Sequence, residues 1–236
     1  MSLINKKIFC IIPAFEEEKN IVKVINKILN LDNKDNQPLI DKIVVIDDGS
    51  SDQTYKLAKK IKSNRLTVLR HIINRDQGAS LQTGNDYALL KKADIIVHFD
   101  ADDQFVAEEI NKMVEPIIKD NYDVVLGSRF LDNKTKMPKF KKNIIMPIAR
   151  LVNKIFFNIN LTDPQSGFRA MKRKVLEKIK IEQDGKAHCS EILYKIYKNK
   201  FKVKEVPITV IYHEFGQNFG GGVRIVKDFI LNKLTQ

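Results

Sequence analysis

The sequence predicts a single α/β domain, built on a mostly parallel sheet with helices on both faces. Over the first 130 residues, short apolar runs typical of buried strands alternate with longer segments of helical periodicity. Such alternation is typical of strand–helix–strand units, whose strands run parallel. The chain has 236 residues, of which 43% are hydrophobic and 30% charged, which is enough for one domain with a substantial core.

Five apolar runs are the expected strands of this sheet, and Pro13 is expected to end the first of them. They are Lys7–Ile12, Lys42–Ile46, Leu66–Leu69, Ile95–Phe99 and Tyr122–Leu126. Apolar residues with helical spacing mark helices between them: Ile21–Leu29, a helix capped by Ser51 or Asp52, Gly78–Leu90 and Val106–Lys119.

After Phe130 the pattern changes. Residues 131–142 form a polar, lysine-rich connection, and apolar residues from Ile144 to Ile159 mark one face of an amphipathic helix surrounded by basic residues. This helix is expected either to lie on an anionic membrane surface or to pack in the core or in a homodimer. A compact turn at 163–169, a helix at 187–198, an edge strand at 202–212, a glycine-rich loop at 216–222 and a terminal helix at 223–234 complete the chain.

The net charge of +12 favours an anionic partner: a phosphorylated substrate, acidic lipid headgroups or nucleic acid. Nucleic acid ranks last, because the chain lacks a recognition motif and interleaved aromatic residues. Two cysteines without CxxC spacing favour a reducing compartment. With no signal segment and no apolar run of about 18 residues, we expect a cytoplasmic protein, at most peripheral on the cytoplasmic face of a membrane.

Three carboxylates follow the fourth strand within four positions: Asp100, Asp102 and Asp103. Like charges crowded together are costly unless a cation relieves them. Asp100 and Asp102 could both reach one divalent cation, and hard oxygen ligands favour Mg²⁺ or Mn²⁺ over zinc. The alternative is that Asp102 or Asp103 caps the following helix.

Polar turns follow three of the expected strands, at Pro13–Glu18, Asp47–Asp52 and Asp100–Gln104. In a parallel sheet these turns meet at one edge, where open α/β sheets bind their ligands. We therefore expect the active site at this edge.

Six short motifs then occur in order, and together they resemble family 2 inverting glycosyltransferases of the GT-A fold. They are PAFEE from Pro13, DDGSSD from Asp47, DADDQ from Asp100, GSRF from Gly127, SGFR from Ser166 and EVPI from Glu205. The similarity spans about residues 7–215, and the branch it resembles most is that of dolichol-phosphate mannosyltransferases and polyprenyl-phosphate glucosyltransferases. It implies a nucleotide-sugar half at 1–130 and an acceptor half at 131–236.

The resemblance implies a nucleotide-sugar donor of the UDP-glucose or GDP-mannose type and a metal held by Asp100 and Asp102. It implies that Glu17 contacts the ribose or base, that Asp47 binds the base, and that Gly49 allows close backbone approach. The full donor set that it implies is Pro13, Ala14, Glu17, Asp47, Gly49, Asp76, Gly78, Asp100, Ala101, Asp102, Arg169 and His213.

The resemblance also implies catalytic roles. Gln104 is expected near the metal or the donor sugar, and Arg129 and Arg169 on the acceptor side, where an anionic phosphate needs basic partners. Salt bridges to cleft aspartates are the alternative for both arginines. A polyprenyl phosphate acceptor needs no general base, whereas a sugar hydroxyl does, and Glu191 is the candidate base. A surface role for Glu191 is equally open.

Departures from the branch lie mainly near the C-terminus. His213 stands where an arginine is expected, Gln217-Asn218 replaces Ser-Lys, and Asp103 replaces an apolar residue. These changes leave two alternatives open: a glycan or glycolipid hydroxyl acceptor, and a nucleotide-sugar-binding protein without transferase activity.

Overall fold

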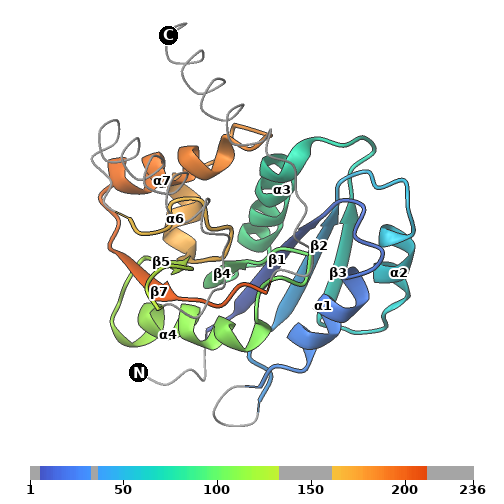
Figure 1. The fold of residues 1–236 in the computed structure, drawn as a ribbon, viewed down its shortest axis with the longest axis horizontal. Helices are drawn as coiled ribbons and strands as arrows, with labels where there is room; N and C mark the ends of the chain where they lie inside the picture. The colour runs from blue at the N-terminus through green and yellow to red at the C-terminus, as the bar shows by residue number, and fades with distance from the viewer. Residues whose placement is uncertain (1–5, 33–36, 133–160, 212–236) are drawn as a thin grey trace, which may run out of the picture.

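The fold is organised around one seven-stranded sheet (Figure 1). The computed structural model describes residues 6–32, 37–132 and 161–211. Along the sheet the strand order is β3-β2-β1-β4-β6-β5-β7. The strands are β1 (Ile8–Ala14), β2 (Lys42–Asp47), β3 (Leu66–Arg70), β4 (Ile95–His98), β5 (Val124–Ser128), β6 (Arg169–Lys172) and β7 (Val203–Pro207).

The sheet is mostly parallel, as predicted. β1 pairs in parallel with β2 and β4, β2 with β3, and β5 with β7. Only β6 runs antiparallel among the described strands, between β4 and β5. β6 therefore begins where β4 ends, and His98 stands opposite Arg169 in the register.

Helices cover both faces of the sheet (Figure 1). Residues of three helices pack in the apolar core on one face: α1 (Ile21–Leu29), α2 (Thr54–Lys60) and α4 (Ile110–Lys119), the last preceded by a short 3-10 helix at Ala107–Glu109. Three others pack in the core on the other face: α3 (Asp76–Leu90), α6 (Arg173–Lys178) and α7 (His188–Lys198). The inward face predicted for α1 is confirmed, because Ile21, Val24, Ile25 and Ile28 are buried.

Some predicted boundaries were wrong by one or two residues. β1 runs through Pro13 to Ala14, because its pairing with β4 ends at Ile11 and the missing N–H of Pro13 costs no ladder hydrogen bond on that side. α3 begins at Asp76 rather than Gly78, and β5 ends at Ser128 rather than Leu126. The edge position expected from Pro207 is confirmed, because β7 is the last strand of the sheet.

Several predicted features lie outside the described residues: the amphipathic helix at 144–159, the loop at 216–222, the terminal helix at 223–234 and His213. Within the ranges 6–32, 37–132 and 161–211, no helix is long and apolar enough to cross a membrane.

Candidate active site

A cleft of about 340 Å³ opens at the carboxyl ends of β1, β2 and β4. Its walls carry residues from the end of β1 and the turn after it, from the turns after β2 and β4, from the loop before α3 and the start of that helix, and from the loop before α7. They are Pro13, Ala14, Phe15, Glu17, Asp48, Asn74, Asp76, Gln77, Ser80, Asp100, Ala101, Asp102, Gly185 and Lys186. The predicted meeting of the three acidic turns at one sheet edge is therefore confirmed.

Backbone-to-side-chain hydrogen bonds hold the turns after β1 and β2 together. The amide of Glu16 donates to Ser50 Oγ over 3.0 Å, and the amide of Glu17 donates to Thr54 Oγ1 over 2.8 Å. These bonds fix the backbone, so that the Glu17 side chain faces the cleft while Asn20 donates to its carboxylate over 2.8 Å. Burial raises the pKa of Glu17, and the Asp102 charge adds to this effect.

Asp100 and Asp102 both line the cleft at the end of β4. Gln77 Nε2 donates to Asp100 Oδ1 over 2.9 Å, and the amide of Gln104 donates to Asp102 Oδ1 over 3.0 Å. Burial, together with the Asp102 charge, raises the pKa of Asp100 to about 7. The turn at Gly167 packs against the same carboxylate, since a Cβ there would lie 2.8 Å from Asp100 Oδ2.

This pair fits a divalent cation. A carboxylate whose pKa is near 7 holds a proton for much of the time, and a cation would replace that proton and relieve the repulsion. Across the part of the chain that the structure describes, no three His, Cys, Asp or Glu side chains gather as a complete metal site. Proteins usually supply one or two carboxylates to a Mg²⁺ site, and substrate phosphates and water complete the coordination.

Asp103 has a structural role. Its carboxylate is 2% exposed and pairs with Lys23 Nζ at 2.6 Å and Lys27 Nζ at 2.5 Å, both from α1. Burial opposes ionisation, but the hydrogen bonds from these two lysines outweigh it and lower the pKa of Asp103. The backbone of Asp103 is left-handed, with φ of +59°, and Asp103 is not part of the cleft lining. Capping of the next helix was the wrong alternative for Asp103, because the N-cap residue is Val106.

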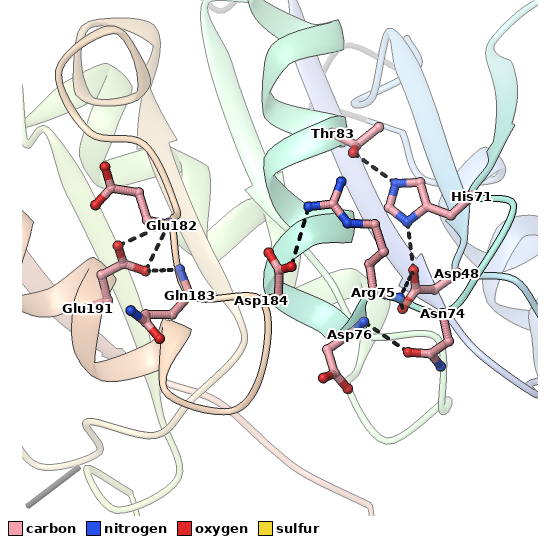
Figure 2. A network of polar contacts seen from close by, with 10 residues as sticks. All are labelled: Asp48, His71, Asn74, Arg75, Asp76, Thr83, Glu182, Gln183, Asp184 and Glu191. Atoms are coloured by element: carbon pink, nitrogen blue, oxygen red, sulfur yellow. Dashed lines mark hydrogen bonds and ion pairs between the residues drawn. The ribbon is translucent and has the colours of Figure 1, made fainter. Parts of the chain in front are cut away.

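Of the two aspartates after β2, Asp48 and not Asp47 lines the cleft. Asp47 is fully buried, with Arg70 Nε 3.0 Å from its Oδ2. Burial raises the pKa of Asp47, although hydrogen bonds from Ser50 and the charge of Arg70 act in the opposite direction. Asp48 accepts hydrogen bonds from the amide of Arg75 and lies 2.6 Å from His71 Nδ1 (Figure 2). The far nitrogen of that ring is 2.9 Å from Thr83 Oγ1, so α3 orients the ring that holds Asp48.

The glycines singled out in the sequence allow protein backbones to approach one another. A Cβ on Gly49, whose φ is +73°, would lie 2.8 Å from the backbone of Ile73 and Asn74. A Cβ on Gly78 would meet the carbonyl oxygen of Gln183 at 2.0 Å. Neither glycine lines the cleft, whereas Asp76 does.

The two arginines expected at the acceptor side are both engaged away from the cleft lining. Arg129 forms a bidentate ion pair with the buried Asp163, at 2.6 Å from Nε and 2.7 Å from Nη2. Arg169 is 1% exposed, and its guanidinium acts on the Cys189 thiol and, through its charge, on Asp100. Among the described residues neither arginine forms an ion pair with an aspartate of the cleft lining.

The interior beside Arg169 holds a cysteine and a histidine from the start of α7. Burial opposes ionisation of Cys189, but Arg169 and His188 outweigh it and lower the pKa of the thiol to about 6. The charge of Arg169 also acts on Asp100, where it partly offsets the rise in pKa. Arg169 therefore supplies positive charge behind the acidic pair.

Glu191 and Gln104 do not line the cleft either. The carboxylate of Glu191 accepts hydrogen bonds from the amides of Glu182 and Gln183 (Figure 2). It also pairs with Lys195 at 2.7 Å. Gln104 acts through its backbone, since its carbonyl accepts from the amide of Ile211 and its amide donates to Asp102.

Sequence reasoning missed several residues of the cleft wall: Asn74, Gln77, Ser80, Gly185 and Lys186, together with the choice of Asp48 over Asp47. The position of Asp48 as the first residue after β2 could have indicated that it, and not Asp47, lines the cleft. The other residues come from the start of α3 and from a loop about 85 residues beyond the acidic pair, and no local pattern indicates that these segments meet.

Comparisons with known proteins agree with this geometry. Residues 9–180 match the family described as Glycosyl transferase family 2. The chain is 35% identical to the UDP-N-acetylglucosamine–dolichyl-phosphate N-acetylglucosaminyltransferase of Methanococcus voltae, covering 94% of this chain and 92% of that protein. It is 32% identical to the dolichol-phosphate mannosyltransferase of Pyrococcus furiosus, over 86% of this chain and 56% of the relative.

A crystal structure of glucosyl-3-phosphoglycerate synthase from Mycobacterium tuberculosis, in complex with Mn²⁺, UDP and glucosyl-3-phosphoglycerate, has the same fold. Its TM-score is 0.72 at 18% sequence identity, over 97% of this chain and 80% of that chain. The resemblance to GT-A glycosyltransferases is thus confirmed by both sequence and fold. The chain belongs to glycosyl transferase family 2 and is a glycosyltransferase.

Proposed function

We propose that the protein transfers a sugar from a nucleotide-sugar to a polyprenyl or dolichyl phosphate, with inversion at the anomeric carbon and with Mg²⁺ or Mn²⁺. The observation that carries this proposal is the carboxylate pair Asp100 and Asp102 at the end of β4, inside a cleft bounded by the turns after β1 and β2. The relatives named for transfer to dolichyl phosphate support the acceptor.

The cleft suits a nucleotide-sugar in size and in its polar groups. Its volume of about 340 Å³ lies in the range of small-molecule sites. Asp48 and Glu17 offer fixed carboxylate acceptors for N–H or O–H groups of a base and a ribose, and Asp48 replaces Asp47 as our candidate base contact. The donor is of the UDP-sugar or GDP-sugar type.

Asp100 and Asp102 would hold the metal, and the relative solved with Mn²⁺ and UDP supports a divalent cation. When bound, the cation supplies positive charge that neutralises the charge growing on the departing nucleoside diphosphate. Gln77 would keep Asp100 oriented toward it, and the Gln104 amide would do the same for Asp102.

The reaction would be a single displacement. An oxygen of the acceptor phosphate forms a bond to the anomeric carbon while the bond from that carbon to the diphosphate oxygen breaks, which inverts the configuration. A lipid phosphate is already ionised near neutral pH, so no base has to remove a proton. The position of Glu191, whose carboxylate is occupied by two amides and Lys195 and does not line the cleft, supports an acceptor of this kind.

A polyprenyl acceptor would bring the protein to a membrane surface. The basic amphipathic segment at 144–159, outside the described residues, is the candidate for peripheral contact with anionic lipids, and a homodimer interface is its other proposed use.

The test is acceptor-dependent release of nucleoside diphosphate. UDP-, GDP-, CDP- and dTDP-sugars are each incubated with a short-chain prenyl phosphate, with Mn²⁺ or with chelator. We expect release with one donor, abolished by chelator and in Asp102→Asn. Asp103→Asn is the matched control, because it makes the same change one position along, outside the cleft.

Other outcomes decide between the alternatives. Release that requires a glycan or glycolipid hydroxyl would replace the lipid phosphate as acceptor. Binding of a nucleotide-sugar without release under any condition would indicate a binding protein. If no donor binds in a metal-dependent way, the proposal is refuted.

A further inference from the structure

The described residues of the cleft wall carry five carboxylates and one cation. The carboxylates are Glu17, Asp48, Asp76, Asp100 and Asp102, and the cation is Lys186. Two arginines that could have contributed are engaged elsewhere, since Arg129 pairs with Asp163 and Arg169 lies inside the protein. A substrate bearing several phosphate charges meets a strongly acidic wall, so positive charge at this point matters more than on an open surface.

Lys186 is available for a ligand. Its side chain is exposed, and within the described ranges no carboxylate pairs with it. The loop that carries it, residues 181–187, lines the cleft together with the turn after β1. Its ammonium group offers three N–H donors on a long stem, which suits the oxygens of a phosphate.

The backbone beneath Lys186 is held on one side by α7. Glu191 accepts hydrogen bonds from the amide of Glu182 at 3.0 Å and from the amide of Gln183 at 2.9 Å. Lys195, one turn further along the helix, pairs with Glu191 at 2.7 Å and keeps that carboxylate in place.

The same loop is held on the other side by α3. The amide of Gly78 donates to the carbonyl of Asp184 over 2.6 Å, and Arg75 pairs with the Asp184 carboxylate at 3.3 Å (Figure 2). Gln82 accepts a hydrogen bond from the amide of Ile181 over 2.7 Å. Anchors on both sides therefore fix the position from which Lys186 reaches the cleft.

From these observations we propose that Lys186 binds a phosphate group of the substrates, and that Glu191 is a positioning residue that holds the loop carrying Lys186. The inference rests on the proposed function, because it assigns a residue to the phosphates of that reaction. The phosphate is either the diphosphate of the donor or the phosphate of the acceptor, which share one chemistry. Glu191 then acts through Lys186 and removes no proton.

The experiment measures kcat and KM for donor and for acceptor separately in Lys186→Met, Lys186→Arg and Glu191→Gln. Lys178→Met, an exposed lysine of α6 outside the cleft lining, is the matched control. We expect Lys186→Met to raise KM for one substrate by about 10- to 100-fold, as for loss of one charged hydrogen bond. Lys186→Arg keeps the charge and should restore most of the affinity.

The substrate whose KM rises carries the phosphate that Lys186 binds. A raised KM for the nucleotide-sugar, accompanied by weaker binding of the free nucleoside diphosphate with Mn²⁺, assigns Lys186 to the donor. A raised KM for prenyl phosphate alone assigns it to the acceptor. If Lys186→Met matches Lys178→Met in both constants while the wild type is active, the inference is overturned and the proposed function stands.

The role of Glu191 is read from a double-mutant cycle. Glu191→Gln should raise the same KM as Lys186→Met, and the double variant should be no worse than Lys186→Met alone. Purely structural damage would instead add to the effect of Lys186→Met, and that result would remove Glu191 from the proposal. If Glu191 were a general base, Glu191→Gln would lower kcat, and this loss relative to the wild type would be largest at high pH, where the wild-type carboxylate is ionised; that result would return Glu191 to catalysis. An inactive wild type with every donor would refute the proposed function itself.

Discussion

Replacing Gly78 by alanine should displace the loop at 181–187, because the backbone of that loop lies directly against the first turn of α3. The new Cβ would stand 2.0 Å from the carbonyl oxygen of Gln183 and 2.7 Å from that of Asp184, where contacts below 3.0 Å are essentially never seen. The loop would have to withdraw by about 1 Å. Both obstructing atoms belong to the backbone, so no side chain can rotate away.

The magnitude follows from three contributions to the free energy of unfolding. Overpacking of this kind costs about 1–3 kcal/mol. Stretching the 2.6 Å hydrogen bond from the Gly78 amide to Asp184 costs about 1 kcal/mol more. Alanine in a helix gains back about 1 kcal/mol relative to glycine. The variant should therefore be destabilised by about 1–3 kcal/mol.

Urea unfolding measures this loss, and binding of a nucleoside diphosphate with Mn²⁺ reports on the cleft. Gly185→Ala is the control, because it lies in the same loop and its Cβ would come no closer than 3.6 Å to Asp76 Oδ2. We expect the control to retain wild-type stability. If Gly78→Ala unfolds at the same urea concentration as Gly185→Ala and binds the nucleotide as well as the wild type does, the packing argument fails.

Three further predictions concern the charged residues. Arg129→Met leaves Asp163 as a buried, unpaired carboxylate and should destabilise the fold by about 3–5 kcal/mol in urea unfolding, whereas a loss below 1 kcal/mol would contradict a buried pair. Asp103→Asn, which retains a residue that tolerates positive φ, should cost about 1–2 kcal/mol and leave nucleotide affinity unchanged; weaker nucleotide binding would place it in the site. Because the pKa of Asp100 is raised to about 7, the cation must displace a proton below that pH, so Mn²⁺ affinity should fall up to about tenfold per unit as the pH decreases below 7. A calorimetric titration of Mn²⁺ that shows no change between about pH 6 and 8 would refute that shift.

Local sequence was sufficient for the strands and helices of the first 130 residues. Apolar runs and helical spacing predicted them, and the structure confirms their predicted bounds within two positions, except that α4 begins at Ile110, after the 3-10 helix at Ala107–Glu109, and not at Val106. The meeting of the acidic turns at one edge followed from parallel topology alone. The resemblance to family 2 followed from motifs whose residues stand close together in the sequence.

Contacts between segments that are distant in the sequence decided which of these residues line the cleft and which are buried. Two adjacent aspartates after β2 look alike in the sequence, but the pleat of the strand buries Asp47 and places Asp48 on the cleft wall. The antiparallel insertion of β6 turns Arg169 into the interior, so its charge acts on the acidic pair from behind.

The chain by itself determined which chemistry is present: carboxylates at strand ends, glycines at turns and basic residues in excess. The tertiary structure alone decided which of them share a cleft. Asp103 and Arg129 are as polar as Asp102 and Lys186, but the first two are satisfied by α1 and by Asp163, and the last two face the cleft. The physical reason is that a buried charge requires a partner of opposite charge. When that partner lies tens of residues away in the sequence, the two side chains meet only once the sheet and its helices have packed.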